Sequence, residues 1–230
     1  MLFLPLLLAL PGQIEVTPTK NFSQEQQIKA IVATVSVVNE ADKTQGSGAI
    51  VRQNGPFVYV LTAAHIVGGA ETVSVSLFSA KSYPKPERVV KRAEVVARAK
   101  NSDVALLRFE MREPVPGVVS LCPLKLVPED QAFPVLLAGC EQGQPTCVEA
   151  AVQGKKQVRK PDVDTATLIW EVGKKPPKGR SGGPLIDRRG YLLGLCSGTS
   201  AQKGYYTHID EIHACLQQNG FRWLSKEEDK

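Results

Sequence analysis

The sequence lacks several features that each point to a class of protein. No stretch approaches the roughly 20 consecutive apolar residues that span a bilayer, so we do not expect the chain to cross a membrane. The five cysteines form no C-x-x-C pair, which argues against a structural zinc site, and we expect neither a metal nor a cofactor. Long helical patterns that connect parallel strands are also missing, and their absence argues against an alternating α/β fold.

A strong charge of one sign is missing as well. The net charge of +5 is mild, and aromatic residues make up only 6% of the chain. The basic residues are dispersed apart from one group, which comprises Lys155, Lys156, Arg159, Lys160, Lys174, Lys175, Lys178 and Arg180. A nucleic-acid-binding protein normally has a denser basic stripe in an aromatic or helical context. We therefore expect no nucleic-acid partner and interpret this group as a solvated rim near a site.

The overall amino-acid composition is typical of a soluble globular protein. Hydrophobic residues make up 43% and charged residues 22% of the 230 residues, which suffices for a core without metal or disulfide staples. Residues 1–10 are almost wholly apolar and are followed by Pro11, Gly12 and Gln13. This pattern predicts a signal peptide over residues 1–12 and a periplasmic or secreted protein. A buried N-terminal strand or a misassigned start is the alternative.

The cysteines allow two interpretations. Cys140 and Cys147 flank a six-residue loop that can bring them within bridging distance in an oxidising compartment. The alternative is that all five are small core residues. The five are Cys122, Cys140, Cys147, Cys196 and Cys215.

Short β-branched runs separated by Gly, Pro, Asn and Asp turns predict ten strands, at intervals typical of antiparallel barrels or sandwiches. The runs are 31–38, 48–51, 57–63, 72–78, 88–98, 103–109, 134–139, 147–154, 165–172 and 190–196. Four prolines within 111–128 indicate a connection between two β-rich halves.

Helices are expected only near the two ends. Ser23 and Gln26 form a capping-box pattern that opens a short helix. Ile209, Ile212 and Leu216 have helical spacing, and Gly220 suits the end of that helix. The apolar residues expected to dock this end onto the body are Phe221, Trp223 and Leu224.

Residues 179–184, Gly-Arg-Ser-Gly-Gly-Pro, are the most informative segment. Glycines on both sides of Ser181 let the backbone turn sharply, which exposes the hydroxyl and aims consecutive N–H groups at one point. A serine nucleophile needs such donors, because the tetrahedral intermediate places negative charge on an oxygen. Taken alone, however, a serine among glycines is usually only a loop.

A histidine and an aspartate supply the groups that a serine nucleophile requires. His65 follows an apolar strand and is one of three histidines, and an imidazole can take the serine proton and return it to the leaving group. Asp103 stands immediately before another apolar strand, where a carboxylate can fix the histidine tautomer. The other two histidines, His208 and His213, are interpreted as structural.

Four segments together resemble the trypsin-like (chymotrypsin-fold) serine peptidases. They are G-S-G-A-I at 46–50, T-A-A-H at 62–65, D-V-A-L-L at 103–107 and G-x-S-G-G-P-L at 179–185, in the order of the family. The resemblance covers approximately residues 30–210. The short intervals between His65, Asp103 and Ser181 are more similar to the bacterial HtrA-type enzymes than to the digestive ones, and no PDZ domain is visible after the peptidase region.

The resemblance implies an all-β fold of two antiparallel six-stranded barrels with a C-terminal helix. The expected ranges are an N-terminal extension at 13–29, barrels at 30–120 and 121–208, and the helix and tail at 209–230. It also implies a triad of His65, Asp103 and Ser181, with an oxyanion hole from the N–H groups of Gly179 and Ser181. The residues expected to line the substrate cleft are Lys175, Ser197, Gly198 and Thr199. The partner would be a polypeptide substrate, and we expect a monomer.

Two positions depart from the family pattern. Arg180 stands where digestive enzymes have an aspartate that pairs with a newly cleaved N-terminus, so activation by that ion pair is not expected. Lys175 stands where trypsin has an aspartate that selects basic substrates. A lysine there would repel Lys or Arg side chains, which predicts a preference for small, apolar or acidic residues before the cleaved bond.

Two alternatives are weaker. The Gly179-x-Ser181-x-Gly183 pattern also fits the nucleophile elbow of α/β-hydrolases, which would make the protein an esterase, but Pro184 would obstruct the helix that must follow. A catalytically silent module that only binds peptides is the second alternative. Silent members of a family usually lose a triad residue, whereas all three are present here.

Overall fold

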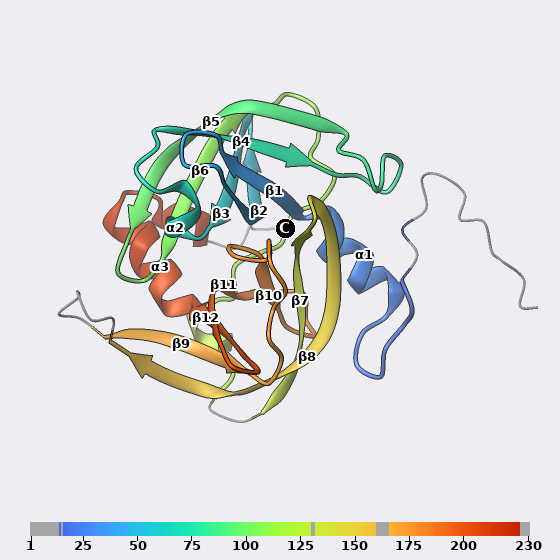
Figure 1. The fold of residues 1–230 in the computed structure, drawn as a ribbon, viewed down its shortest axis with the longest axis vertical. Helices are drawn as coiled ribbons and strands as arrows, with labels where there is room; N and C mark the ends of the chain where they lie inside the picture. The colour runs from blue at the N-terminus through green and yellow to red at the C-terminus, as the bar shows by residue number, and fades with distance from the viewer. Residues whose placement is uncertain (1–13, 15, 130–131, 160–165, 226–230) are drawn as a thin grey trace, which may run out of the picture.

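The computed structural model describes residues 14, 16–129, 132–159 and 166–225, and consists of two closed antiparallel barrels of six strands each. Figure 1 shows the first barrel in the upper half of the molecule and the second in the lower half. The first contains β1 (Thr34–Asn39), β2 (Thr44–Asn54), β3 (Phe57–Thr62), β4 (Thr72–Leu77), β5 (Arg88–Ala99) and β6 (Val104–Glu110). The second contains β7 (Phe133–Glu141), β8 (Gln144–Val158), β9 (Thr167–Val172), β10 (Pro184–Ile186), β11 (Leu192–Ser200) and β12 (Lys203–His208). The all-β two-barrel prediction is confirmed.

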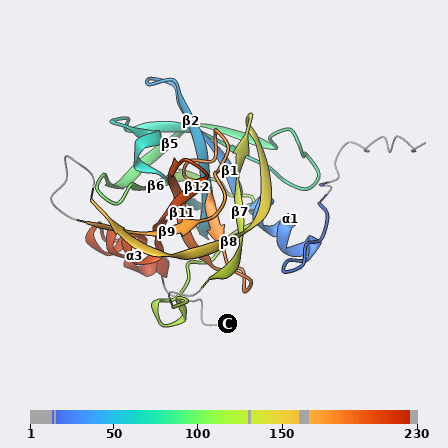
Figure 2. The same ribbon diagram turned by 60° about the horizontal axis from the view of Figure 1, so that its bottom comes forward.

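Three α-helices and two 3₁₀ turns complete the described part of the chain. They are α1 (Gln24–Val32), α2 (Ala64–Val67), α3 (Ile209–Gln218) and the turns at Leu124–Leu126 and Arg222–Ser225. Figure 2 shows α1 and α3 on opposite sides of the barrels, as Figure 1 does. None of the described helices is long and apolar enough to cross a membrane. The expected signal peptide at 1–12 lies outside the described residues.

The strand predictions need three corrections. Ile31 and Val32 are the last residues of α1, because the Ser23–Gln26 capping box starts a helix that continues to them. Two strands were missed, β10 and β12. The first has only three residues and the second mixes lysine, glycine and tyrosine, so neither produces an alternating pattern of its own. Pairing with β11 holds both in the second barrel.

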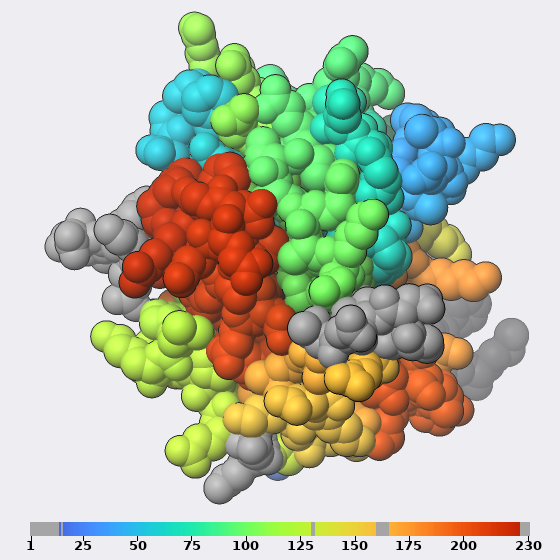
Figure 3. Space-filling model, turned by 90° about the vertical axis from the view of Figure 1, so that its left-hand side faces the viewer, coloured from blue at the N-terminus to red at the C-terminus, as the bar shows by residue number. Residues whose placement is uncertain are grey.

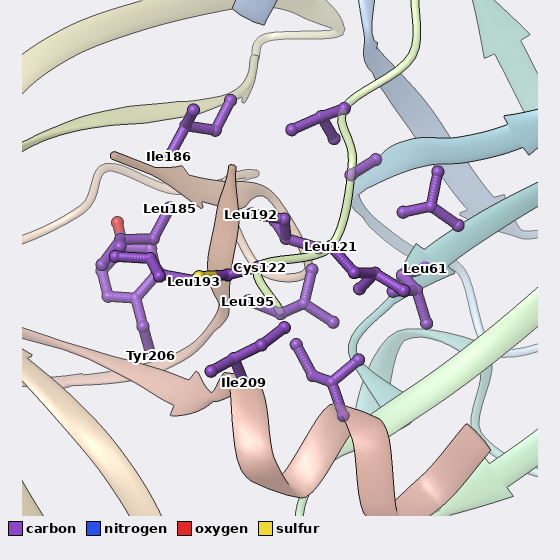
Figure 4. Packing of buried hydrophobic residues seen from close by; sticks show 14 of the residues in the cluster. Leu61, Leu121, Cys122, Leu185, Ile186, Leu192, Leu193, Leu195, Tyr206 and Ile209 are labelled. Atoms are coloured by element: carbon purple, nitrogen blue, oxygen red, sulfur yellow. The ribbon is translucent and has the colours of Figure 1, made fainter. Parts of the chain in front are cut away.

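The hydrophobic core joins the two barrels. One cluster fills the first barrel, and a larger one includes side chains from both barrels and from α3. Figure 4 shows Leu61 of β3, Leu192 of β11 and Ile209 of α3 in this larger cluster, together with Leu121 of the connecting segment. The backbone of that segment pairs with the second barrel where Leu121 forms a parallel bridge to Leu192. This packing fixes one barrel against the other.

The C-terminal segment docks onto the body of the protein, as expected, and its aromatic contacts are with the first barrel. The rings of Trp223 and Phe221 lie 5.1 and 6.2 Å from that of Tyr59 in β3, and Leu224 is buried. Figure 3 shows this segment in red against the green strands of the first barrel. His213 is structural, since its two ring nitrogens lie 2.7 Å from Ser225 Oγ and 2.8 Å from the Cys122 carbonyl oxygen. Charged residues 226–230 lie outside the described residues.

Two further expectations concern the ends of α3 and the state of the cysteines. His208 caps the start of α3 by accepting a hydrogen bond from Asp210 N. The helix ends at Gln218, with Asn219 as its C-cap and Gly220, which has a φ of +82°, directly after it. All five cysteines are free thiols, so the disulfide interpretation of Cys140 and Cys147 is wrong. Burial raises the pKa of the Cys140 thiol to about 12 and that of Cys147 to about 11, which keeps both protonated at neutral pH.

Candidate active site

His65 lies at the mouth of the first barrel, where β3 gives way to the single turn of α2. Its backbone N–H donates to Asp103 Oδ1 at 2.9 Å, which ties the start of α2 to the start of β6. The imidazole is 45% exposed, so one edge of the ring is accessible. His65 is therefore held in place by its backbone N–H, while part of its imidazole ring is exposed to solvent.

Asp103 turns the chain into β6 with a φ of +58°, a left-handed conformation that aspartate tolerates better than most residues. Its carboxylate is buried and lies 2.8 and 3.0 Å from His65 Nδ1. Ser197 Oγ donates to the same carboxylate at 2.5 Å. An ionised acceptor beside Nδ1 places the proton of neutral His65 there and leaves Nε2 as the basic nitrogen.

The electrostatics of this carboxylate follow from its contacts. Burial alone would raise the pKa of Asp103, but hydrogen bonds from His65 and Ser197 and the attraction of the histidine charge outweigh it. The pKa of Asp103 consequently lies below its ordinary value, and the group stays ionised at neutral pH. It can therefore stabilise the imidazolium that forms whenever His65 accepts a proton.

Ser181 is at the centre of a tight turn in the second barrel. Gly179 and Gly182 have φ values of +92° and +82°, in the region that favours glycine. Gly182 N donates to the Cys196 carbonyl at 2.7 Å, and Gly183 N donates to the Arg180 carbonyl at 2.8 Å. The turn is thus closed by its own backbone and attached to β11.

The two halves of the site meet at the interface between the barrels. A Cβ on Gly46 would lie 2.6 Å from the Ser181 carbonyl oxygen and 2.7 Å from Ile66 Cδ1, so only glycine fits between them. Ile66 is the neighbour of His65. No hydrogen bond joins Ser181 Oγ to His65 in the described part of the chain, and such contacts commonly tighten only when substrate binds.

Ser47 joins the barrels and was not singled out by sequence reasoning. Its N–H donates to the Ser181 carbonyl at 2.7 Å, and its hydroxyl donates to the Gly179 carbonyl at 2.7 Å. The same hydroxyl accepts a hydrogen bond from Cys140 N at 2.7 Å. The only sequence signal was its place in the G-S-G-A-I segment, which gives no hint that the side chain reaches the second barrel.

The other sequence-predicted residues are placed as follows. His65, Asp103 and Ser197 line one open cavity of about 520 Å³, with Ala64, Gly68 and Lys100. Ser197 was expected in the substrate cleft and also bonds to Asp103 through its side chain. Gly198 pairs with Tyr205 in the second barrel, and Thr199 and Lys175 are exposed. Among the described residues no group of His, Cys, Asp or Glu side chains is arranged to hold a metal ion.

The fold and this constellation define the class of two-barrel hydrolases with a serine, a histidine and an aspartate at the interface. The family model of the trypsin-like peptidase domain matches residues 46–195, and the chain belongs to this family.

The individual relatives share only 21–25% sequence identity with this chain. A curated protein of Staphylococcus epidermidis, "Serine protease HtrA-like", is 25% identical over 171 residues, which is 69% of this chain and 27% of that protein. The chain thus spans about a quarter of the length of that relative. The active form of the Rv3671c protease from M. tuberculosis has a TM-score of 0.68 at 22% identity and covers 95% of both chains. A serine endoprotease from Yersinia pestis has a TM-score of 0.65 at 21% identity, over 90% of this chain and 68% of the other.

Proposed function

We propose that this chain is a serine endopeptidase that cleaves peptide bonds through an acyl-enzyme on Ser181. The observation that carries the proposal is the buried Asp103 carboxylate bound to His65 Nδ1, which leaves Nε2 as a base on the side open to solvent. Membership of the trypsin-like peptidase family supports the same activity. The catalytic residues in this proposal are His65, Asp103 and Ser181.

The chemistry follows from these positions. Ser181 Oγ attacks the carbonyl carbon of the substrate while His65 Nε2 takes the hydroxyl proton. The negative charge that forms on the carbonyl oxygen is stabilised by the N–H groups of Gly179 and Ser181. His65 then returns the proton to the leaving amine, and the C–N bond breaks. Water, activated by the same histidine, releases the acyl group and restores Ser181.

A protein substrate tests the activity directly. Wild type and the variants Ser181→Ala and His65→Ala are incubated with an unfolded protein such as casein, and the new amino termini are counted by mass spectrometry. We expect internal cleavage by the wild type and none by either variant. Equal product formation by wild type and Ser181→Ala would overturn the proposal, because the cleavage would then have another source.

We further propose a preference for small, apolar or acidic residues before the cleaved bond. Lys175 belongs to an exposed segment that packs on β12, since a Cβ on Gly204 would lie 2.8 Å from Pro176 Cδ and 2.9 Å from the Lys174 oxygen. Next to Gly204, Lys203 forms an ion pair with Glu171 at 2.7 Å.

The balance of charge around this segment is positive. Glu171 also pairs with Lys156 at 2.6 Å, so one carboxylate is shared by two lysines. In the described part of the chain Lys175 has no acidic partner. A basic side chain approaching it would be repelled, whereas an acidic one would be attracted.

A peptide library read by mass spectrometry measures this preference. We expect Lys175→Glu to increase cleavage after Lys and Arg at least several-fold relative to wild type. The matched control is Lys91→Glu, which makes the same charge change on exposed β5 and should leave the preference unchanged. Faster cleavage after Lys or Arg by the wild-type enzyme would contradict the proposal.

We also propose that the protein is exported, on the basis of the apolar sequence at 1–10. A fusion of residues 1–20 to alkaline phosphatase, which is active only outside the cytoplasm, tests this proposal. Phosphatase activity is expected, and an inactive fusion that accumulates in the cytoplasm would contradict it.

A further inference from the structure

Arg180 is a buried cation directly before the nucleophile. Its side chain is 2% exposed, although arginine is almost never fully buried unless it is paired. In the sequence it stands between Gly179 and Ser181, the two residues proposed to supply the oxyanion donors. The catalytic steps described above do not use its guanidinium.

Among the described residues, all hydrogen-bond partners of the guanidinium lie on the hairpin of β7 and β8. Nε and Nη2 donate to Glu141 Oε1 at 2.9 and 2.5 Å, and Nη1 donates to the Leu137 carbonyl at 2.7 Å. Nη2 also donates to Thr146 Oγ1 at 2.8 Å, and that hydroxyl donates to Glu141 Oε1 at 2.9 Å. We refer to Arg180, Leu137, Glu141 and Thr146 as the Arg180 anchor.

The surrounding backbone leaves Arg180 little freedom. A Cβ on Gly139 of β7 would lie 2.9 Å from Arg180 Cγ and 3.2 Å from its Cα, so the arginine lies flat against a glycine. Charged hydrogen bonds are about twice as strong as neutral ones, and the planar guanidinium makes several at fixed angles. The position of Arg180 Cα is therefore set by the hairpin as well as by the turn.

The position of Arg180 determines the direction of one oxyanion donor. The Arg180 carbonyl accepts a hydrogen bond from Gly183 N at 2.8 Å. In a planar trans peptide the C=O and N–H groups point in opposite directions, so the N–H of Ser181 points away from Gly183. The anchor fixes the Cα of Arg180, and the hydrogen bond from Gly183 N fixes the rotation of the peptide plane about that Cα, so the two together hold the direction of the Ser181 N–H.

We infer that Arg180 is a positioning residue, and that its ion pair with Glu141 keeps the Ser181 N–H aimed at the developing oxyanion. This inference rests on the proposed peptidase activity. Arg180, the residue before the nucleophile, pairs with the side chain of Glu141 on the β7–β8 hairpin. The Ser181 N–H is therefore held in position without an ion pair to a chain terminus. Loss of the ion pair should weaken stabilisation of the transition state more than binding of substrate.

The test compares Glu141→Gln with Glu94→Gln. Both break a pair in which arginine Nε and Nη2 bind one carboxylate oxygen, but the Arg108–Glu94 pair is exposed on the first barrel. Steady-state kinetics are measured on a peptide substrate, and affinity is measured for a peptide boronic acid whose tetrahedral adduct with Ser181 resembles the intermediate. Thermal unfolding shows that each variant is folded at the assay temperature.

We expect Glu141→Gln to lower kcat by about 10–100-fold with little change in KM, and to weaken boronate binding by a similar factor. Glu94→Gln should behave as wild type. A folded Glu141→Gln enzyme with unchanged kcat and boronate affinity would overturn the inference while leaving the proposed activity intact. An inactive wild type would instead refute the activity itself.

A second variant covers the case in which Glu141→Gln does not fold. Thr146→Val keeps the shape of the side chain and removes only the hydrogen bonds of the hydroxyl to Arg180 and Glu141. We expect a smaller fall in kcat, again without a matching rise in KM. If kcat is unchanged, or if kcat and KM change only as the melting temperature falls, the anchor is structural and the inference is wrong.

Discussion

Replacement of Ser47 by alanine should uncouple the nucleophile turn from the first barrel. The hydroxyl of Ser47 is fully buried and satisfies two groups of the second barrel, the carbonyl of Gly179 and the N–H of Cys140. Alanine removes this partner without adding volume. A buried polar group left unpaired costs about 1–3 kcal/mol, and Gly179 is only half-buried, so we expect the two lost hydrogen bonds to lower the free energy of unfolding by about 2–4 kcal/mol.

The loss should be visible in both stability and catalysis. For a domain of this size, 2–4 kcal/mol corresponds to a fall of about 4–16 °C in Tm. The released Gly179 carbonyl lets the adjoining peptides rotate, so kcat should fall by more than about tenfold, up to the fall of about 10²–10³ that follows complete loss of one oxyanion donor. Differential scanning fluorimetry and peptide hydrolysis measure the two effects on the same preparation.

The matched control is Ser36→Ala. Ser36 is the residue of β1 directly opposite Ser47 in β2 and is also buried. Within the described residues its hydroxyl makes a single hydrogen bond, which it accepts from the Gln45 side chain at 3.3 Å. We expect this variant to lose less than about 1 kcal/mol and to keep its kcat. Equal Tm and kcat values for the two variants would refute the idea that the Ser47 hydroxyl connects the barrels.

Other consequences of the geometry can be checked separately. Gly182→Ala should abolish folding or activity, since the residue has a φ of +82° and a Cβ there would lie 2.8 Å from Ala63 N; a variant with wild-type Tm and kcat would contradict this. The lowered pKa of Asp103 contributes stability that is complete above its ordinary value of 3.8 and is lost as pH falls through the lower folded value, so urea unfolding of Asp103→Asn should depend less on pH in that range than wild type. Trp223→Ala should cost about 1–3 kcal/mol of stability through loss of packing on Tyr59 but leave kcat unchanged, and a kcat loss in folded enzyme would contradict the structural role. Thiol titration with a chromogenic disulfide should count five free cysteines after denaturation and proceed slowly in the native protein, whereas a count of three would indicate a disulfide bond.

Much of the fold could be predicted because its signals are local. The Ser23–Gln26 capping box, the alternation in β4 and the helical spacing in α3 each depend on neighbours a few residues apart. Strand β10 was not found because three residues have no period, and its position depends on pairing with β7 and β11. The end of α1 was placed too early because Ile31 and Val32 favour strands by composition, whereas the preceding cap and the burial of the helix face determine the outcome.

The candidate site, like the fold, could be predicted only where its signals are local. His65, Asp103 and Ser181 stand in short segments whose glycines and small residues are visible in the sequence. The residues that hold them in place cannot be recognised in the sequence, because the partners are far apart along the chain. Ser47 lies 132 residues from Gly179, and Arg180 lies 39 residues from Glu141. A buried serine and a half-exposed glutamate have no distinguishing pattern until the barrels bring them to their partners. Sequence reasoning saw that Arg180 departs from the family and had no means to find what it binds.

Covalent labelling by a fluorophosphonate shows whether Ser181 is an activated nucleophile, because the probe phosphonylates a serine only when a base and oxyanion donors activate it. Intact mass and peptide mapping are compared for wild type, Ser181→Ala and His65→Ala, with His213→Ala as a control for loss of a histidine outside the site. We expect one adduct on Ser181 in wild type and in His213→Ala, and none in the other two variants. A folded wild-type protein that takes up no probe, or that is labelled at another serine, would contradict the claim that Ser181 is an activated nucleophile.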